Sequence, residues 1–459
     1  LFLLGRRALL WATVAATPFF LVVVIELPFA PVRAFQFFGG LLILRHLMDR
    51  CIQGHLRIRA TGTTAATVTF TSVVVLSIFA PALLSEPIYV APEGILSIAA
   101  AYENRVPLQF RVSNITQVTY PFFGVLLFWF LAANLRSFQD LKRVLQILVV
   151  SFTALVSFAA VYIGLYFVGG EAIMDTLFPM FSNERSARYS SGSYNALGGL
   201  IRAYTPAGEP GYTGVYYVII LSMLFALRYG GYKNAYQPKA ATALLVTAVI
   251  AIITNASTTA YFGVVSLLGA YLFVLVLRRD REMTTGNSTR LVVRVAAVLV
   301  VVTFSAIFML QFLSVSIVDY VVQNHVAKLT EEAGSGAIRL FAVQYSIQEV
   351  FLKSSLFGVG YGSHRALSLI VYLLANIGIV GVAAFLWLNG IVFWHGMKVM
   401  NGDDDPKYAS IAFALNVSHL ALLATLFVAK SETSLSFGWL WLVLAMSESL
   451  YRLHKAKAL

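Results

Sequence analysis

Charged side chains are scarce in this sequence. Asp, Glu, Lys and Arg make up 12% of the 459 residues, whereas soluble domains carry about 25%. Hydrophobic residues make up 59%, and the mean hydropathy is +0.79. This composition excludes an ordinary soluble globular protein and predicts an all-α, polytopic integral membrane protein.

Cysteines, linkers and metal-ligand clusters are also few. The single cysteine, Cys51, excludes an intramolecular disulfide framework and a cysteine-based zinc site. No polar linker or repeat of fixed period divides the chain, so residues 1–459 are predicted to form one transmembrane domain. No carboxylate/histidine cluster has metal-ligand spacing, and the Asp403–Asp405 run is predicted to be a solvated cytoplasmic loop. We therefore expect no metal and no other cofactor.

Long apolar runs predict about 12 membrane-spanning helices. We interpret the first run as a retained helix, because no small-residue cleavage site clearly follows it. Within the predicted spans, Glu26 and Glu448 lie near helix ends, where snorkelling or pairing with a neighbouring helix is the simplest role. The runs lie near residues 8–28, 33–48, 64–84, 115–134, 145–168, 211–228, 240–256, 258–277, 292–312, 367–394, 408–429 and 434–451.

The distribution of Lys and Arg predicts the orientation. The net charge of +12 comes from clusters that all fall on one face of the predicted bundle. The positive-inside rule makes that face cytoplasmic, with both termini on it. The excess charge is thus explained by topology and does not indicate nucleic acid. The clusters lie at residues 6–7, 45–59, 136–143, 228–239, 278–294, 398–407 and 452–457.

Three long external loops are predicted at residues 85–114, 169–210 and 313–366. In the last, between the ninth and tenth spans, residues 337–352 have apolar side chains at helical spacing and predict an amphipathic helix on the membrane. Two of these loops concentrate arginines with aromatic side chains and glycines. Arginine forks bind phosphate bidentately, although each arginine alone could equally anchor its loop to lipid headgroups. The candidate binding residues are Arg185, Arg188, Arg202, Arg339, Arg365, Tyr212 and Tyr361.

Two short stretches hold candidate proton acceptors. Glu209, before the stiff Pro210, is predicted near a helix N-terminus, either as a base or as a charge that stabilises the helix dipole. Leu356 to Arg365 contains three alternating glycines, which let the backbone turn and approach a ligand. His364 in that stretch is either a base for a sugar hydroxyl or a surface histidine with no role.

These stretches, in this order along the chain, resemble the O-antigen ligase/polymerase superfamily, especially Wzy-type polysaccharide polymerases. The likeness covers most of the chain from about residue 110. It is carried by SNITQ at 113–117, GEP at 208–210, STTAYFG at 257–263, RLFAVQ at 339–344, SLFGVGYG at 355–362 and YLLANIGIVG at 372–381.

The resemblance implies a GT-C-like fold and a glycosyltransferase of the bacterial inner membrane. It implies transfer of a growing glycan from undecaprenyl diphosphate onto an incoming lipid-linked repeat unit at the periplasmic face. Arg339 and Arg202 would bind the diphosphate, and Glu209 matches the Gly-Glu-Pro position. Expected partners are the lipid-linked oligosaccharide, membrane lipids, a chain-length regulator and a flippase.

The sequence departs from the family at two places. The His-Asn pair that ligases carry before their last motif is replaced by Leu367 and Ser368, which favours a polymerase and leaves the base open between Glu209 and His364. A pattern of Arg, ten residues, then Gly is not met, because Thr213 follows Arg202 at that spacing. A ligase of the same fold and a lipid-linked oligosaccharide flippase are the alternatives.

Overall fold

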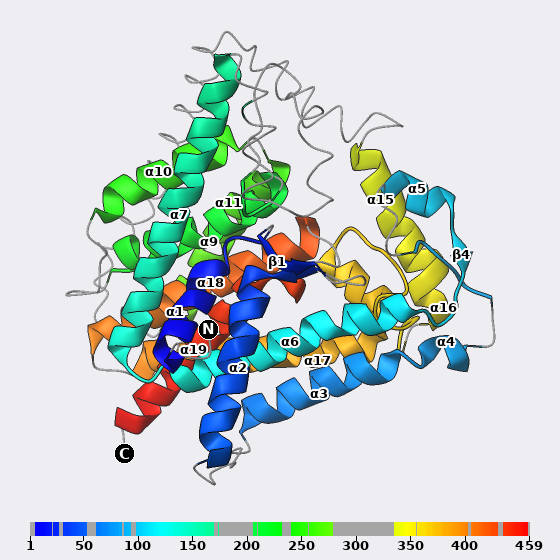
Figure 1. Cartoon of the computed structure of the whole chain (residues 1–459), viewed down its shortest axis with the longest axis horizontal. Helices are drawn as coiled ribbons and strands as arrows, with labels where there is room; N and C mark the ends of the chain where they lie inside the picture. The colour runs from blue at the N-terminus through cyan, green and yellow to red at the C-terminus, as the bar shows by residue number, and fades with distance from the viewer. Residues whose placement is uncertain are drawn as a thin grey trace.

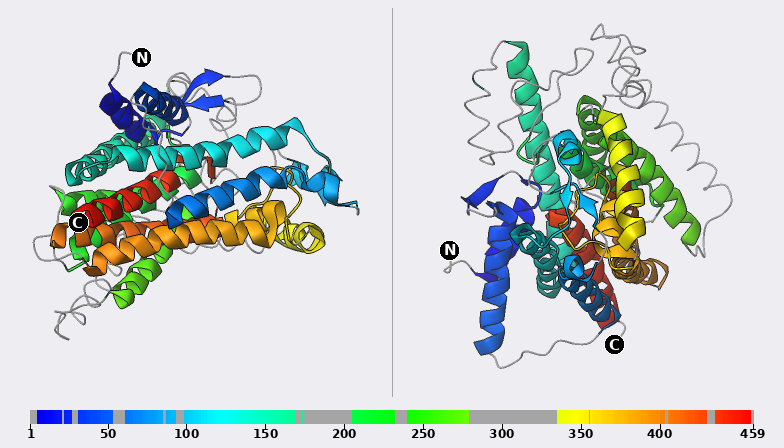
Figure 2. Two further views of the ribbon diagram at one scale, coloured as in Figure 1. Left: turned by 90° about the horizontal axis from the view of Figure 1, so that it is seen from below. Right: turned by 90° about the vertical axis from the view of Figure 1, so that its right-hand side faces the viewer.

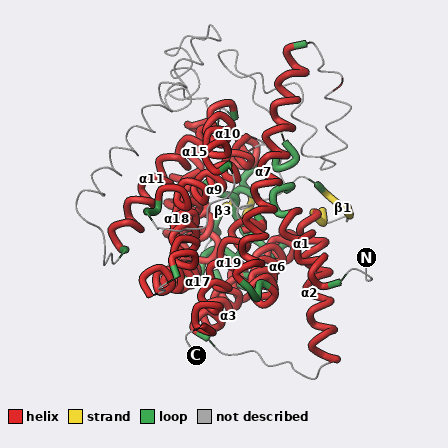
Figure 3. Tube along the Cα trace, turned by 90° about the vertical axis from the view of Figure 1, so that its left-hand side faces the viewer, coloured by secondary structure: helices red, strands yellow, loops and turns green. Residues whose placement is uncertain are grey.

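The protein is mostly helical in its computed structural model (Figure 1). The structure describes residues 5–20, 22–26, 31–52, 61–84, 87–92, 98–168, 173, 205–208, 210–231, 240–255, 257–278, 335–354, 356–402, 405–429 and 435–457. The strands in these ranges form two antiparallel ribbons, β1 (Val23–Glu26) with β2 (Pro31–Arg33), and β3 (Tyr89–Val90) with β4 (Val106–Pro107). Figure 3 shows how little of the described chain they occupy.

Among the described residues, six helices are long and apolar enough to cross a membrane, and they make this a helical membrane protein. They are α6 (Val112–Asn134), α7 (Phe138–Phe167), α9 (Pro210–Tyr229), α11 (Thr258–Leu277), α17 (Leu369–Gly402) and α18 (Pro406–Ala429).

The remaining helices are shorter or less apolar. They are α1 (Arg6–Ala16), α2 (Ala34–Ile52), α3 (Gly62–Ser77), α4 (Ala80–Leu83), α5 (Ile98–Glu103), α10 (Ala241–Thr254), α15 (Ser335–Tyr345), the π-helical turn η4 (Ser346–Phe351), α16 (Leu352–Ser354) and α19 (Gly438–Lys457). Helices thus lie where the second to eighth and the tenth to twelfth spans were predicted, and the predicted span at 292–312 lies outside the described residues.

The first predicted span, 8–28, is wrong as a single helix. α1 has 11 residues, about 16 Å of helix, and ends at Ala16. Pro18 has no N–H to continue the helical ladder, and the β-branched residues that follow enter β1. Glu26 is exposed in that strand instead of lying in a membrane helix.

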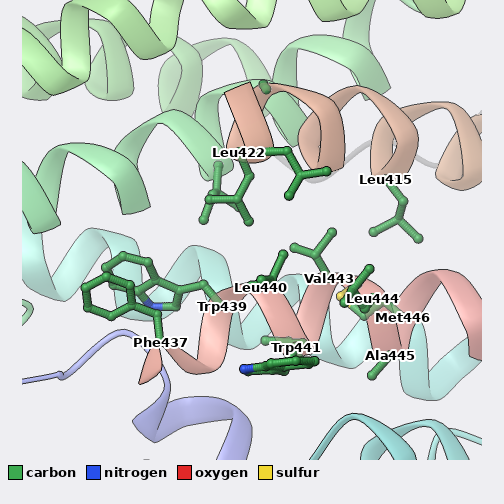
Figure 4. Packing of buried hydrophobic residues seen from close by; sticks show 14 of the residues in the cluster. Leu415, Leu422, Phe437, Trp439, Leu440, Trp441, Val443, Leu444, Ala445 and Met446 are labelled. Carbon is green, nitrogen blue, oxygen red and sulfur yellow. The ribbon is translucent and has the colours of Figure 1, made fainter. Parts of the chain in front are cut away.

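The core is packed around α18, which contacts α9, α11, α17 and α19. Small residues allow the close approach: a side chain at Gly214 of α9 would meet Ala260 of α11 at 2.8 Å. Trp441 of α19 likewise fills the space left by Gly124 of α6. Figure 4 shows Leu440 and Val443 of α19 facing Leu415 and Leu422 of α18, with Trp441 on the other side of α19.

Helix ends that were predicted to share a face lie together. Thr63, at the start of α3, donates to Glu448 near the end of α19, and Tyr271 near the end of α11 donates to the carbonyl of Tyr229 at the end of α9. We call this face the inner end. The opposite face, where α3 ends and α6 and α17 begin, is the outer end. α3, α6 and α17 run side by side between the two (Figures 1 and 2).

The predicted amphipathic helix at 337–352 is confirmed as helical, since α15, η4 and α16 follow one another from Ser335 to Ser354. Ala342, Ser346 and Val350, four residues apart, form its buried face. Leu340 and Leu352 are exposed. Its position on a membrane stays a prediction.

Candidate active site

The glycine-rich stretch between α16 and α17, residues 356–368, forms a compact loop at the outer end. We call it the glycine loop. Gly358, Gly360 and Gly362 have φ of 67°, 98° and 77°, a region that other residues rarely adopt. The prediction that these glycines turn the backbone is confirmed. Among the described residues, what they approach is the protein itself: a Cβ on Gly358 would lie 2.4 Å from the backbone of Asn376.

The glycine loop closes a break in α17. Gly378 has φ 64° and ψ −169°, which interrupts the helix about two and a half turns after its start at Leu369. A broken helix leaves carbonyl groups without their helical donors. The backbone N–H groups of Val359 and Gly360 donate to the carbonyls of Ala375 and Asn376, each at 2.9 Å. The loop therefore replaces the hydrogen bonds that the break removes.

The Asn376 side chain ties the loop to the helix. Its Oδ1 accepts from the N–H groups of Ser363 (3.1 Å) and His364 (2.9 Å). Its Nδ2 donates to the carbonyls of His364 (2.8 Å) and Tyr372 (2.9 Å). Asn376 is fully buried, so each of these bonds replaces one to water, and the loop has one geometry.

Helices α6 and α3 hold the other side of the loop. Asn114 at the start of α6 donates to the carbonyl of Tyr361 (3.0 Å) and to the Ser363 hydroxyl (2.7 Å). Ser77 at the end of α3 accepts from the Tyr361 N–H (3.1 Å). Residues from 113–117, 356–362 and 372–381, three separate stretches of the sequence, thus meet at one place.

A second layer covers the loop from outside. The Tyr102 hydroxyl of α5 donates to the carbonyl of Arg365 (2.6 Å), and the Arg365 N–H donates to the carbonyl of Ala91 (2.9 Å). The described residues of the predicted external loop 85–114 therefore pack on those of the loop 313–366. This pairing positions both segments over the outer end.

His364 is not a surface histidine, because it is fully buried. Its Nδ1 accepts from the Ala91 N–H (3.1 Å), so the neutral ring carries its proton on Nε2, which is 2.8 Å from the Ser346 hydroxyl. Burial lowers the pKa of His364 to about 3. With no lone pair left for a substrate, His364 does not fit the role of base and instead positions the loop.

The other predicted site residues are not all brought together. Arg365 is half-buried in the glycine loop, and Arg339 is exposed on α15. Tyr361 is buried, with its ring 5.4 Å from that of Tyr372. Tyr212 lies apart, between the rings of Phe20 (5.8 Å) and Phe437 (5.0 Å). The predictions for Arg185, Arg188, Arg202 and Glu209 lie outside the described residues.

The residues on either side of Glu209 are rigidly held. Thr205 and Gly208 bond each other through both backbone N–H groups, at 3.2 and 2.9 Å. The Thr205 and Thr213 hydroxyls are 2.7 Å apart, and Asn255 donates to the carbonyl of Pro210 at 2.7 Å. Residues 205–208 and the start of α9 are thus tied to each other and to Asn255.

Sequence reasoning missed the residues that organise the site. Asn376 interrupts an apolar span, and a buried amide in such a place is a signal that could have been used. Tyr102 and Ser346 carry no such signal, because nothing in the sequence shows that they contact the same histidine.

No metal site is present among the residues that the structure describes, since they contain no group of three or more His, Cys, Asp and Glu able to hold an ion. A comparison with protein-family models found no match, and one with curated proteins found none either. The class that the fold defines is a helical membrane protein with a glycine loop seated in a broken helix.

Proposed function

We propose that this protein is a polysaccharide polymerase of the bacterial inner membrane, a glycosyltransferase with a GT-C-like fold and about 12 spans. It moves a growing glycan from undecaprenyl diphosphate onto an incoming lipid-linked repeat unit, without a metal, at the periplasmic face. In this proposal the inner end of the bundle is cytoplasmic, with both termini, and the outer end is periplasmic.

One observation carries the proposal. The described residues of the stretches that resemble the polymerase family, 113–117, 356–362 and 372–381, converge at the outer end through Asn114 and Asn376. Loose motifs that matched by chance would have no reason to share one packed site. The stretch 339–344 lies on α15, which reaches this site through Ala342 and Tyr102.

The proposed chemistry divides the roles between cations and one base. Arg339 and Arg202 stabilise the diphosphate as it leaves. Glu209 takes the proton of the acceptor hydroxyl while the new bond forms at the anomeric carbon and the bond to diphosphate breaks. One finding favours Glu209 over His364: both ring nitrogens of His364 are occupied.

The test is chain extension by the purified full-length protein in lipid nanodiscs, supplied with lipid-linked repeat units. Wild-type protein is expected to lengthen the glycan, and Arg339→Ala to lose most of this activity. Arg7→Ala, an exposed arginine at the inner end, is the matched control and should keep it. Glu209→Gln should lower the rate while donor lipid still binds.

The outcomes separate the three functions. A flippase would move lipid-linked oligosaccharide across the bilayer without lengthening it, and Arg339→Ala should leave any such movement unchanged if the protein is a polymerase. A ligase would transfer glycan to a lipid or protein that carries no repeat unit. If wild-type protein never lengthens the glycan, the polymerase proposal is wrong.

A further inference from the structure

An open cleft lies beside the glycine loop, between residues 87–92 and 98–107 on one side and the helix α15–η4 on the other. Its volume is about 610 Å³, within the ~300–1,000 Å³ that small-molecule sites occupy. Tyr89, Glu103 and Arg105 form one wall. The other wall is formed by Phe341, Gln344, Gln348 and Glu349 of the helix, with Tyr345. Figure 1 shows β4, α5 and α15 gathered at this edge.

Tyr345 holds the two walls together. Its hydroxyl donates to the carbonyl of Tyr89 at 2.9 Å, and the Arg105 guanidinium lies 4.8 Å from the centre of its ring. The Tyr102 ring packs edge-on against it at 5.8 Å. Burial raises the pKa of Tyr345, so its hydroxyl stays protonated and keeps donating at neutral pH. The cleft is therefore formed before any ligand enters.

The side chains that face the cleft suit a polyol. Tyr89 and Phe341 are 52% and 48% exposed on opposite walls, too exposed to serve a core and able to stack on the C–H faces of sugar rings. Gln344 and Gln348 are exposed amides that both donate and accept. Glu103 and Glu349 supply carboxylate oxygens, which accept from hydroxyl groups.

The charge of the lining does not favour a diphosphate as the ligand. Two carboxylates face one cation, Arg105, which is already seated over the Tyr345 ring. Lys353 pairs with Glu349 at 2.8 Å, so the four charged groups together carry no net positive charge. Arg339 lies two residues before Phe341, which on a helix is the opposite side. The cleft and Arg339 therefore meet different parts of a ligand.

We propose that this cleft binds uncharged sugar units of the glycan. The inference rests on the proposed function for the identity of that glycan, and it assigns the sugars a site separate from the arginines that meet the diphosphate. The volume accommodates a short oligosaccharide segment, held by stacking on Tyr89 and Phe341 and by hydrogen bonds to the amides and carboxylates.

The experiment measures binding without catalysis. Full-length protein in nanodiscs is titrated with a panel of free neutral oligosaccharides of hexoses and N-acetylhexosamines, and binding is followed by calorimetry and by saturation-transfer NMR. Phe341→Ala is expected to weaken binding about tenfold, and Gln348→Ala to weaken it less. Phe122→Ala and Gln139→Ala are the controls, because Phe122 is 46% exposed on α6 and Gln139 is exposed at the inner end.

The results distinguish this inference from the proposed function. Binding by the wild type that Phe341→Ala weakens and inorganic diphosphate does not displace supports the sugar cleft, even if no chain extension is observed. The inference is overturned if no member of the panel binds or if diphosphate competes with the bound oligosaccharide. It is also overturned if Phe341→Ala binds the oligosaccharide as tightly as the control Phe122→Ala does.

Discussion

The two ends of the bundle are held by different kinds of polar contact. At the outer end, uncharged amides of Asn114 and Asn376 bond to backbone groups of the glycine loop. At the inner end, the buried carboxylate of Glu448 accepts from His395 (2.8 Å), Arg452 (3.0 Å) and Thr63 (3.1 Å).

This difference indicates a different structural role for each end. An amide that bonds to backbone fixes the path of a loop, because both its donors and its acceptor must be satisfied. A shared carboxylate instead links whole helices, here α3, α17 and α19. The outer end is therefore built for one precise loop shape, and the inner end for attachment of helices to each other.

The largest expected effect is that of Gly358→Ala at the outer end. The new Cβ would lie 2.4 Å from the backbone carbon of Asn376, at a φ of 67° that disfavours alanine. Strain and overlap together should cost about 3 kcal/mol or more. Thermal unfolding in detergent measures the loss. Gly390→Ala, where a Cβ meets nothing within 4 Å, is the control and should be neutral or slightly stabilising.

The next largest loss of stability is expected for Glu448→Ala, which tests the inner end. It removes the acceptor shared by His395, Arg452 and Thr63, and we expect a loss of about 2 kcal/mol in stability. Arg452 is partly exposed and reaches water, which keeps the effect below that of Gly358→Ala. Glu448→Gln retains an acceptor and should lose less; equal losses for both variants would show that the charge alone matters.

The pH dependence of stability should report on the outer end through His364. His364 stays neutral in the folded protein, with a pKa of about 3 against 6.5 in the unfolded chain. The unfolded chain therefore binds more protons, and stability should fall as pH drops from about 6.5 towards 3, by up to about 1.4 kcal/mol per pH unit. His364→Asn should have a flatter profile in unfolding measured at pH 7, 6 and 5. Identical slopes would contradict the buried neutral ring, because all other histidines are common to both proteins.

The smallest effect is expected for Lys353→Ala. Its ion pair with Glu349, at 2.8 Å, is exposed and spans one helical turn, so its loss should change stability by less than about 0.5 kcal/mol. The same unfolding measurement applies. A loss as large as that of Glu448→Ala would remove the distinction between the exposed pair and the buried carboxylate.

The sequence predicted the parts of the fold that depend on local pattern. Apolar runs placed α6, α9, α11 and α18 within a few residues, and pairing of Glu448 with a neighbouring helix is confirmed. The prediction of the first span was wrong because it relied on the length of the apolar run and did not take account of Pro18, near which the helix ends.

The candidate site was less predictable, because its contacts join distant residues. Three glycines signalled a sharp turn, but not that the turn would fill the break at Gly378. His364 is 273 residues from its partner Ala91, so its burial could not be inferred from neighbouring residues. The cleft of Tyr89 and Phe341 depends on the same long-range pairing.

The break at Gly378 has a consequence for protein engineering. Because Val359 and Gly360 supply donors that the helix itself lacks, the loop and the first turns of α17 are one exchangeable unit. A chimera that replaces the loop alone would leave buried carbonyls without donors, whereas one that transfers residues 356–381 together would carry the matching pair. Chimeras of this region should therefore be cut outside this block.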